Sequence, residues 1–116
     1  ETDYNLKNNH NIDTIIIDST VKKISGGIFN GSFRECTSNV FIPSSVTIIE
    51  SYSFRGCSSL EKIIIPPSVK EIGNFAFSEC TSLKKVVIPS SVIEIGNFLF
   101  SGCTSLEIIF FSNVQH

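Results

Sequence analysis

The sequence lacks the features on which a membrane span, a phosphate-binding loop or a histidine-based catalytic centre would depend. Its 116 residues contain no methionine and only two histidines, His10 and His116, and no window approaches 18 consecutive apolar residues. A membrane-spanning helix needs about 20 such residues, so no span is expected. Neither G-x-G-x-x-G nor P-loop spacing surrounds the glycines, which argues against a bound nucleotide. We therefore expect no enzyme, no catalytic residue and no cofactor.

A strong charge of either sign is also missing. The formal net charge is −2, so no bulk attraction to nucleic acid or to an anionic membrane is expected. The chain begins at Glu1 without the charged and apolar segments of a signal peptide. Any targeting segment is therefore expected to have been removed or to lie outside these 116 residues, and the localisation stays open.

Four cysteines are present, and they follow the repeat described below. Cys57, Cys80 and Cys103 are 23 residues apart, and Cys36 precedes them by 21. Zinc ligands normally occur as C-x₂₋₄-C or with histidine nearby, so no metal site is expected. Stacked neighbours could approach each other, but parallel side chains rarely offer the dihedral of about ±90° that a disulfide needs. The sequence favours a buried row of thiols that act as small apolar groups.

A 23-residue repeat organises nearly the whole chain. The stretch PPSVKEIGNFAFSECTSLKKVVI (66–88) is followed by PSSVIEIGNFLFSGCTSLEIIFF (89–111), which is identical at 14 of 23 positions. A fixed period of this length indicates a solenoid, in which each unit buries its apolar face against its neighbours. The predicted organisation is an N-terminal remnant or cap over 1–11, a solenoid over 12–111 with units 18–42, 43–65, 66–88 and 89–111, and a tail over 112–116.

Each unit contains one clear strand signal. Leu83, Val86 and Ile88 show the alternate apolar spacing of a strand, and Pro89 ends it because proline has no N–H for the ladder. Residues 98–100 leave room for one short helical or 3₁₀ turn. Strands that recur once per coil in the same direction pair in parallel, about 4.8 Å apart. Five are predicted, near residues 12–17, 39–42, 60–65, 83–88 and 106–111.

The repeat resembles the BspA-like, or Treponema pallidum-type, leucine-rich repeats. The pattern C-x-x-L-x-x-I-x-I-P-x-S-V-x-x-I-G-x-x-A-F-x-x-C is represented by Cys80, Leu83, Val86, Ile88, Pro89, Ser91, Val92, Ile95, Gly96, Leu99, Phe100 and Cys103. The resemblance implies an α/β solenoid: a leucine-rich repeat arc with the parallel sheet on its concave face and short helical or 3₁₀ turns on its convex side. It also implies a surface-exposed or secreted protein of a bacterium or parasitic protist, associated with adhesion, although a cytoplasmic location remains open.

The outer face of the sheet is the predicted binding surface. Side chains alternate across a strand, so the residues between the core positions point to the open face. In successive strands these outward positions form a row of large apolar groups: Ile16, Phe41, Ile64, Val87 and Phe110. A neighbouring row holds Thr14, Asn39, Lys62, Lys85 and Ile108. Exposed apolar patches commonly mark interaction sites, although apolar residues also occur here simply because they favour strands. Lys62 and Lys85 would favour a partner of some acidic character.

Three functions are compatible with these observations. They are adhesion to a host or matrix protein, an intracellular scaffold or regulator (for example of a protein phosphatase), and a structural spacer. An uncovered coil at the C-terminal end, or the concave face, also predicts self-association, because a bare strand edge favours pairing. Two smaller expectations are a possible glycan at Asn30 in a secreted chain and an exposed column of like charge at Glu50, Glu71 and Glu94.

Overall fold

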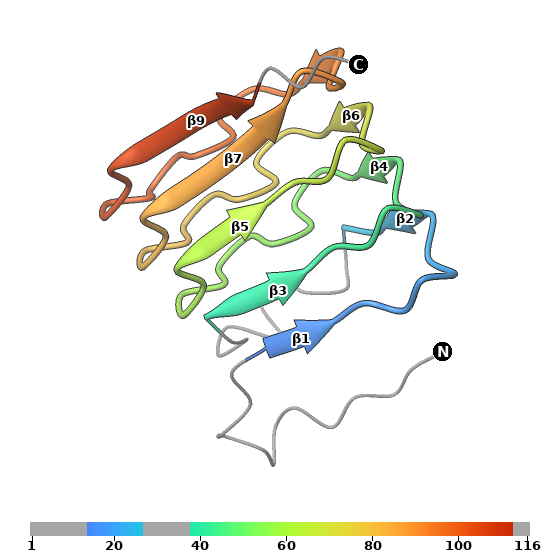
Figure 1. Ribbon diagram of the computed structural model, residues 1–116. Coiled ribbons are helices and arrows are strands. Elements are labelled where there is room, and N and C mark those ends of the chain that lie inside the picture. The colour runs from blue at the N-terminus through green and yellow to red at the C-terminus, as the bar shows by residue number, and fades with distance from the viewer. Residues whose placement is uncertain (1–13, 27–37, 113–116) are drawn as a thin grey trace.

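The computed structural model describes residues 14–26 and 38–112, which wind through successive coils of a solenoid (Figure 1). Within these ranges there is no helix. The strands are β1 (Thr14–Ile16), β2 (Lys23–Ile24), β3 (Asn39–Phe41), β4 (Ile48–Ile49), β5 (Lys62–Ile64), β6 (Glu71–Ile72), β7 (Lys85–Pro89), β8 (Glu94–Ile95) and β9 (Ile108–Ser112). The expectations for residues 1–11, Asn30, Cys36 and the two histidines lie outside the described residues.

A five-stranded parallel sheet forms one side of the solenoid, in the order β1-β3-β5-β7-β9. Figure 1 shows these strands side by side, each one coil after the last. Its register pairs equivalent positions of the repeat, such as Ile63 with Val86 and Val86 with Ile109. The predicted parallel sheet of five strands is therefore confirmed. β3 starts at Asn39 as predicted, whereas β5, β7 and β9 each start two residues later than the apolar pattern suggested.

A second parallel sheet, which the sequence did not reveal, has the order β2-β4-β6-β8. Each of its strands is two residues long. Ile24, Ile49, Ile72 and Ile95 occupy one row of its register. A two-residue strand is too short to show the alternation by which strands are recognised.

The predicted helical or 3₁₀ turns are wrong. Residues 51–56, 74–79 and 97–102 form non-helical turns. In the first two turns every second N–H group donates to the following coil, as from Phe54 N to the oxygen of Ala76 (2.8 Å) and from Phe77 N to that of Leu99 (3.2 Å). Tyr52, Phe75 and Phe98 all adopt positive φ, between 56° and 65°. A backbone that gives its hydrogen bonds to the neighbouring coil cannot also form the bonds of a regular helix.

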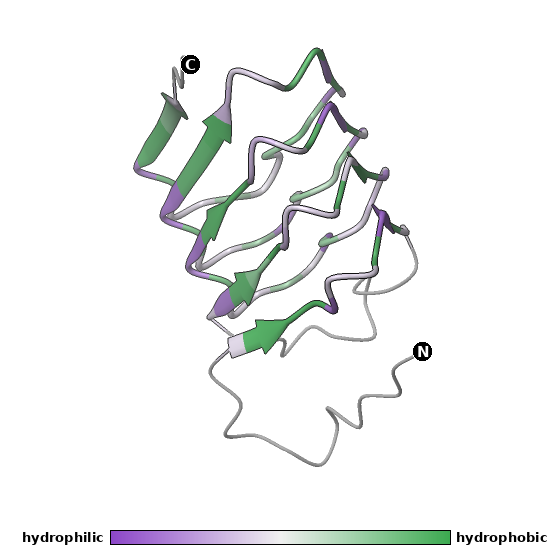
Figure 2. Cartoon of the chain, turned by 45° about the vertical axis from the view of Figure 1, so that its right-hand side comes forward, coloured by the Kyte–Doolittle hydropathy of each residue, from purple (hydrophilic) through white to green (hydrophobic). Residues whose placement is uncertain are grey.

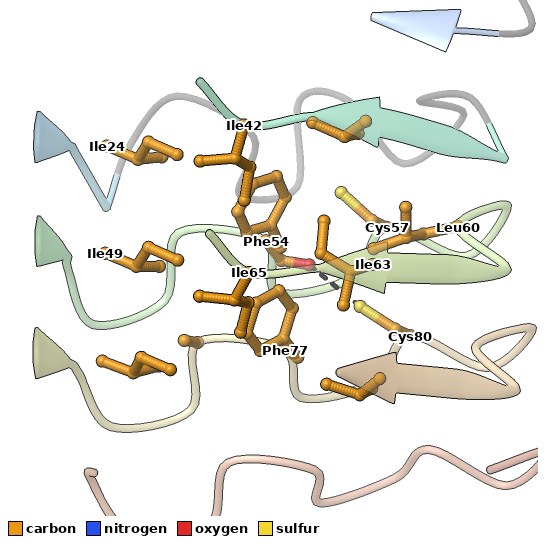
Figure 3. Packing of buried hydrophobic residues seen from close by; sticks show 14 of the residues in the cluster. Ile24, Ile42, Ile49, Phe54, Cys57, Leu60, Ile63, Ile65, Phe77 and Cys80 are labelled. Carbon is orange, nitrogen blue, oxygen red and sulfur yellow. Dashed lines mark hydrogen bonds between the residues drawn. The ribbon is translucent and has the colours of Figure 1, made fainter. Parts of the chain in front are cut away.

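The core lies between the two sheets and consists of rows of equivalent side chains. Figure 3 shows Ile24 above Ile49, Ile42 above Ile65 and Phe54 above Phe77. The rings of Phe54 and Phe77 stack at a centroid distance of 5.2 Å. Fully burying one such side chain is worth about 1.5–3 kcal/mol. Each inner coil therefore has the same set of core side chains. These side chains pack against their equivalents in the coil before and in the coil after.

Polar groups also form a ladder between coils. The side chain of Ser51 accepts a hydrogen bond from Asn74 N (3.1 Å), and that of Asn74 accepts one from Asn97 N (2.7 Å). The adjacent Gly73 permits this approach, since a Cβ there would lie 2.3 Å from Ser51 N. The ladder holds successive coils at a regular spacing. The outer face of the five-stranded sheet is a separate surface, which is also regular and is accessible.

Candidate functional site

The outer face of the five-stranded sheet carries one row of large apolar side chains, which we call the apolar row. Its members are Ile16, Phe41, Ile64, Val87 and Phe110, one from each strand. The alternation that turns Ile15, Val40, Ile63 and Val86 into the core turns these side chains outward. The structure thus brings all five predicted residues into one row.

The apolar row is accessible along its length. Phe41 is 57% exposed and Ile64 53%, whereas Val87 is half-buried. In Figure 2, the strands of this sheet are hydrophobic over most of their length, and hydrophilic colour appears near the start of several of them. A contiguous set of apolar side chains on an open sheet is the kind of surface that a protein partner can cover.

A polar row runs beside the apolar row, and we call it the lysine row. It holds Thr14, Asn39, Lys62, Lys85 and Ile108 in register. Lys62 and Lys85 are directly opposite each other on β5 and β7, and both are exposed. Neither forms a salt bridge with another of the described residues. Two neighbouring positive charges therefore flank the centre of the apolar row.

A hollow of about 530 Å³ lies on this face, over β1, β3 and β5. Phe41, Ile64, Pro66 and Pro67 form much of its apolar wall, and Asn39 and Lys62 border it. The prolines are there because β5, like β3 and β7, leads into a Pro-initiated turn, which is closed here by the bond from Val69 N to the oxygen of Pro66 (3.1 Å). The hollow joins the two rows and could accept an apolar side chain beside a lysine.

Carboxylates flank the strands of this sheet at both ends: Glu61 and Glu107 directly precede β5 and β9, and Asp18 lies beyond β1. Asp18 follows β1 at the turn position that proline occupies in later coils. The Thr20 hydroxyl and the Thr20 N–H (3.3 Å) both donate to its Oδ2. These hydrogen bonds lower the pKa of Asp18, the hydroxyl contributing most. The group is therefore ionised at neutral pH, at the opposite end of the strand from the lysine row.

The second sheet carries a different surface, a groove of about 850 Å³. Glu71 and Glu94 line it and are in register on β6 and β8. Glu50 does not belong to their column, because Glu71 is paired with Ile48, and Glu50 instead contacts Lys23 at 3.5 Å. The predicted three-glutamate column is thus wrong: the repeat alignment fixes Ile48, rather than Glu50, as the equivalent position.

The thiols lie in the core as a row. Cys57 and Cys80 are buried and Cys103 is partly buried. The Sγ of Cys80 donates to the oxygen of Phe54 (3.2 Å; dashed in Figure 3), and that of Cys103 to the oxygen of Phe77 (3.0 Å). The thiols of Cys80 and Cys103 are thus each hydrogen-bonded to the coil before them. In the part of the chain that the structure describes, no group of three metal-ligating side chains gathers.

The last described coil exposes its core positions. Ile95, Ile109 and Phe111 are 48%, 41% and 63% exposed, whereas their counterparts Ile72, Val86 and Ile88 in the preceding coil are buried. The residue types gave a signal for this surface, because the unit 89–111 keeps the apolar positions of the unit before it. This end face is a second apolar surface, separate from the apolar row.

No helix in residues 14–26 or 38–112 has the length and apolar character that a membrane crossing requires. The described residues present three surfaces: the two side-chain rows on the five-stranded sheet, the groove of the second sheet, and the end face of the last described coil.

Comparison with known proteins gives consistent results. Residues 28–116 match the sequence pattern described as BspA type leucine rich repeat region (6 copies). A solved leucine-rich repeat protein of Bacteroides ovatus is 35% identical, with a TM-score of 0.76 over 85% of this chain and 25% of its own. Another, from Eubacterium ventriosum, is 25% identical, with a TM-score of 0.63 over 85% of this chain and 36% of its own. The chain thus spans well under half the length of either protein. No curated protein sequence matches it.

Proposed function

Because the chain belongs to the BspA-type leucine-rich repeat family, we propose that it binds a protein partner on the outer face of its five-stranded sheet. Leucine-rich repeats generally serve as protein–protein interaction modules. The observation that carries the proposal is the apolar row, in which five large side chains from five strands lie in one register. A regular apolar row that is left outside the core gives a partner a continuous surface to desolvate.

The role we favour is adhesion to a host or matrix protein. Support comes from the exposure of the apolar row and from the adhesive role that the repeat's resemblance implies. The second candidate is an intracellular scaffold or regulator, which would grip a partner such as a phosphatase subunit on the same face. A structural spacer is the third. Adhesion and scaffolding both require the apolar row, whereas a structural spacer does not.

A binding experiment with matched variants separates these roles. We expect Ile64→Asp to weaken capture of the partner at least about tenfold, because a charge in a desolvated centre is costly. Binding is measured by interferometry against a panel of purified matrix proteins, and in parallel against an intracellular lysate. Capture by the panel supports adhesion, and capture from the lysate alone supports the scaffold.

The control is Ile93→Asp. Ile93 is 78% exposed and lies outside the apolar row, so this variant adds the same charge on another surface. Equal binding by the two variants, both with the circular-dichroism spectrum of the folded chain, would reject the sheet face as the binding surface. If no panel protein and no lysate protein binds, the structural spacer is the role that remains.

We also propose self-association as a second property, through the end face formed by Ile95, Ile109 and Phe111. Those three side chains are exposed where their counterparts are buried. Strand β9 also presents an edge that has no further partner strand among the described residues. Apolar surface beside an open strand edge favours pairing with a second copy.

A further inference from the structure

We infer that the lysine row selects the partner, and that the partner segment it accepts is an extended peptide with a carboxylate two residues from an apolar side chain. The inference rests on the proposed function, since it concerns the same face. It assigns to Lys62 and Lys85 the recognition of an Asp or Glu side chain. The apolar row and the hollow receive the neighbouring apolar group.

The first support is the electrostatic position of the two lysines. Lys62 and Lys85 are cross-strand partners in the register of β5 and β7. Like charges directly opposite each other destabilise a sheet unless an anion lies between them. Within the described residues neither lysine has a salt-bridge partner, and both are exposed. One carboxylate placed between the two ammonium groups would relieve their repulsion.

The second support is the spacing of the two rows. Adjacent parallel strands are about 4.8 Å apart, so one carboxylate can reach both lysines. The lysine and apolar rows are two residues apart along each strand, which is about 6.6 Å. An extended peptide has the same period, with residues i and i+2 on one side. A peptide with the pattern acidic-x-apolar, lying along β5 and β7, therefore places its carboxylate on the lysines and its apolar side chain against Ile64 and Val87.

The third support is the hollow. Phe41, Ile64 and Pro66 line it beside Lys62. A partner side chain that enters it contacts apolar walls on one side and keeps its neighbouring carboxylate near an ammonium group on the other. The second sheet offers the opposite charge, since Glu71 and Glu94 are in register there. The cross-strand pairs of the two sheets thus differ in charge: two lysines face the acidic segment on the five-stranded sheet, whereas the row of the second sheet holds two glutamates and Lys23.

The test uses short synthetic peptides titrated into the isotopically labelled chain and followed by the amide resonances. One peptide carries Glu-x-Leu, a second Lys-x-Leu and a third Glu-x-Ser, in otherwise identical sequences. We expect Glu-x-Leu to bind at least about tenfold more tightly than Lys-x-Leu at low salt, with an advantage that shrinks as salt screens the charges. The shifted resonances should lie on β3, β5 and β7. Glu-x-Ser should bind more weakly, because it has no apolar group.

Charge variants then assign the effect to residues. Lys62→Glu with Lys85→Glu should reverse the preference, and Lys62→Gln with Lys85→Gln should abolish it. The control, Lys22→Glu with Lys70→Glu, makes the same change in net charge at two exposed lysines outside this face and should leave the affinities within about twofold, since distant surface charges are screened. A reversal in the control would overturn the inference.

Other outcomes separate this inference from the proposed function. If Glu-x-Leu and Lys-x-Leu bind this face equally and Ile64→Asp abolishes both, the binding surface stands and the acidic selectivity falls. Failure of Glu-x-Leu to shift any resonance of β3, β5 or β7 at millimolar peptide also overturns the inference. Phosphatidylserine vesicles and duplex DNA are tested in parallel. If either binds through the lysine pair while the peptide does not, the pair serves a lipid or nucleic-acid phosphate instead.

Discussion

Residues 66–88 and 89–111 are nearly the same sequence in two different environments. They are identical at 14 of 23 positions. In the first, Ile72 is 2% exposed, whereas its counterpart Ile95 in the second is 48% exposed. The apolar pattern is the same, so the difference comes from the coil that follows. A unit of this solenoid does not bury its own core: each coil is covered by the next one.

The comparison therefore predicts that the cost of a mutation depends on the coil rather than on the residue type. Equivalent positions in the two units carry the same side chain in many places, and this provides matched pairs. Two of the three tests below use such pairs and one adds a coil, and they are ordered from the largest expected effect to the smallest.

Leu83→Ala and Leu106→Ala remove the same side chain from neighbouring coils. Leu83 is fully buried and Leu106 only partly. We expect Leu83→Ala to lower the free energy of unfolding by about 2–5 kcal/mol, since it leaves a cavity between two coils. Leu106→Ala should cost about 1 kcal/mol, because less apolar surface is lost. Urea unfolding followed by circular dichroism measures both. Equal costs would contradict the view that neighbours supply burial.

Adding a coil should convert the exposed unit into a buried one. A second copy of residues 89–111, inserted directly after Phe111, would cover Ile95, Ile109 and Phe111. We expect the free energy of unfolding to rise by about 2 kcal/mol, the buried apolar area being partly offset by the entropy of ordering the new coil. Light scattering should show that the self-association proposed for the end face persists, because the added coil exposes the same apolar side chains at the new end.

The control for this insertion carries serine at the added coil's inward apolar positions. It should neither stabilise the chain nor prevent association, since it offers no surface to pack. If the unmodified chain is itself a monomer at tens of micromolar, the end face is not a self-association site. A stabilisation by the serine coil as large as that by the apolar coil would show that packing is not the cause.

Asn74→Ala and Asn97→Ala test the polar ladder in the same way. The side chain of Asn74 accepts the Asn97 N–H at 2.7 Å, whereas no coil after that of Asn97 is among the described residues. We expect Asn74→Ala to cost about 0.5–1.5 kcal/mol, the usual worth of a hydrogen bond. Asn97→Ala should cost less than about 0.3 kcal/mol, because the Asn97 side chain is exposed and accepts no such hydrogen bond within the described residues. Thermal unfolding compares the two. A larger cost at Asn97 would contradict the ladder.

Much of the fold was predictable because the 23-residue pattern recurs several times along the chain. The alternate spacing of Leu83, Val86 and Ile88 predicts a strand, and its recurrence every 23 residues predicts a parallel sheet with like positions in rows. The apolar row and the lysine row follow from the same period. That these rows bind a partner stays a prediction.

The turns and the second sheet were not predictable in the same way. Phe98 and Phe100 were compatible with a short helical turn, and only the inter-coil bonds from Phe54 and Phe77 show why none forms. The two-residue strands of the second sheet give no alternation at all. A signal for the polar ladder did exist, however: Ser51, Asn74 and Asn97 recur at 23-residue spacing, as expected of small polar groups stacked along a solenoid.

The sequence by itself determined the length of the coil, the direction of the main strands and the residue type at each position of every row. Only the tertiary structure decided which of those apolar positions are buried and how the turns run. It also decided that Glu71 pairs with Ile48 and Glu94 in the second sheet. The physical reason is that a repeat pattern is local, whereas burial and inter-coil hydrogen bonds need a neighbour in place. Ile72 and Ile95 show this most directly, since the same side chain is buried in one coil and exposed in the next.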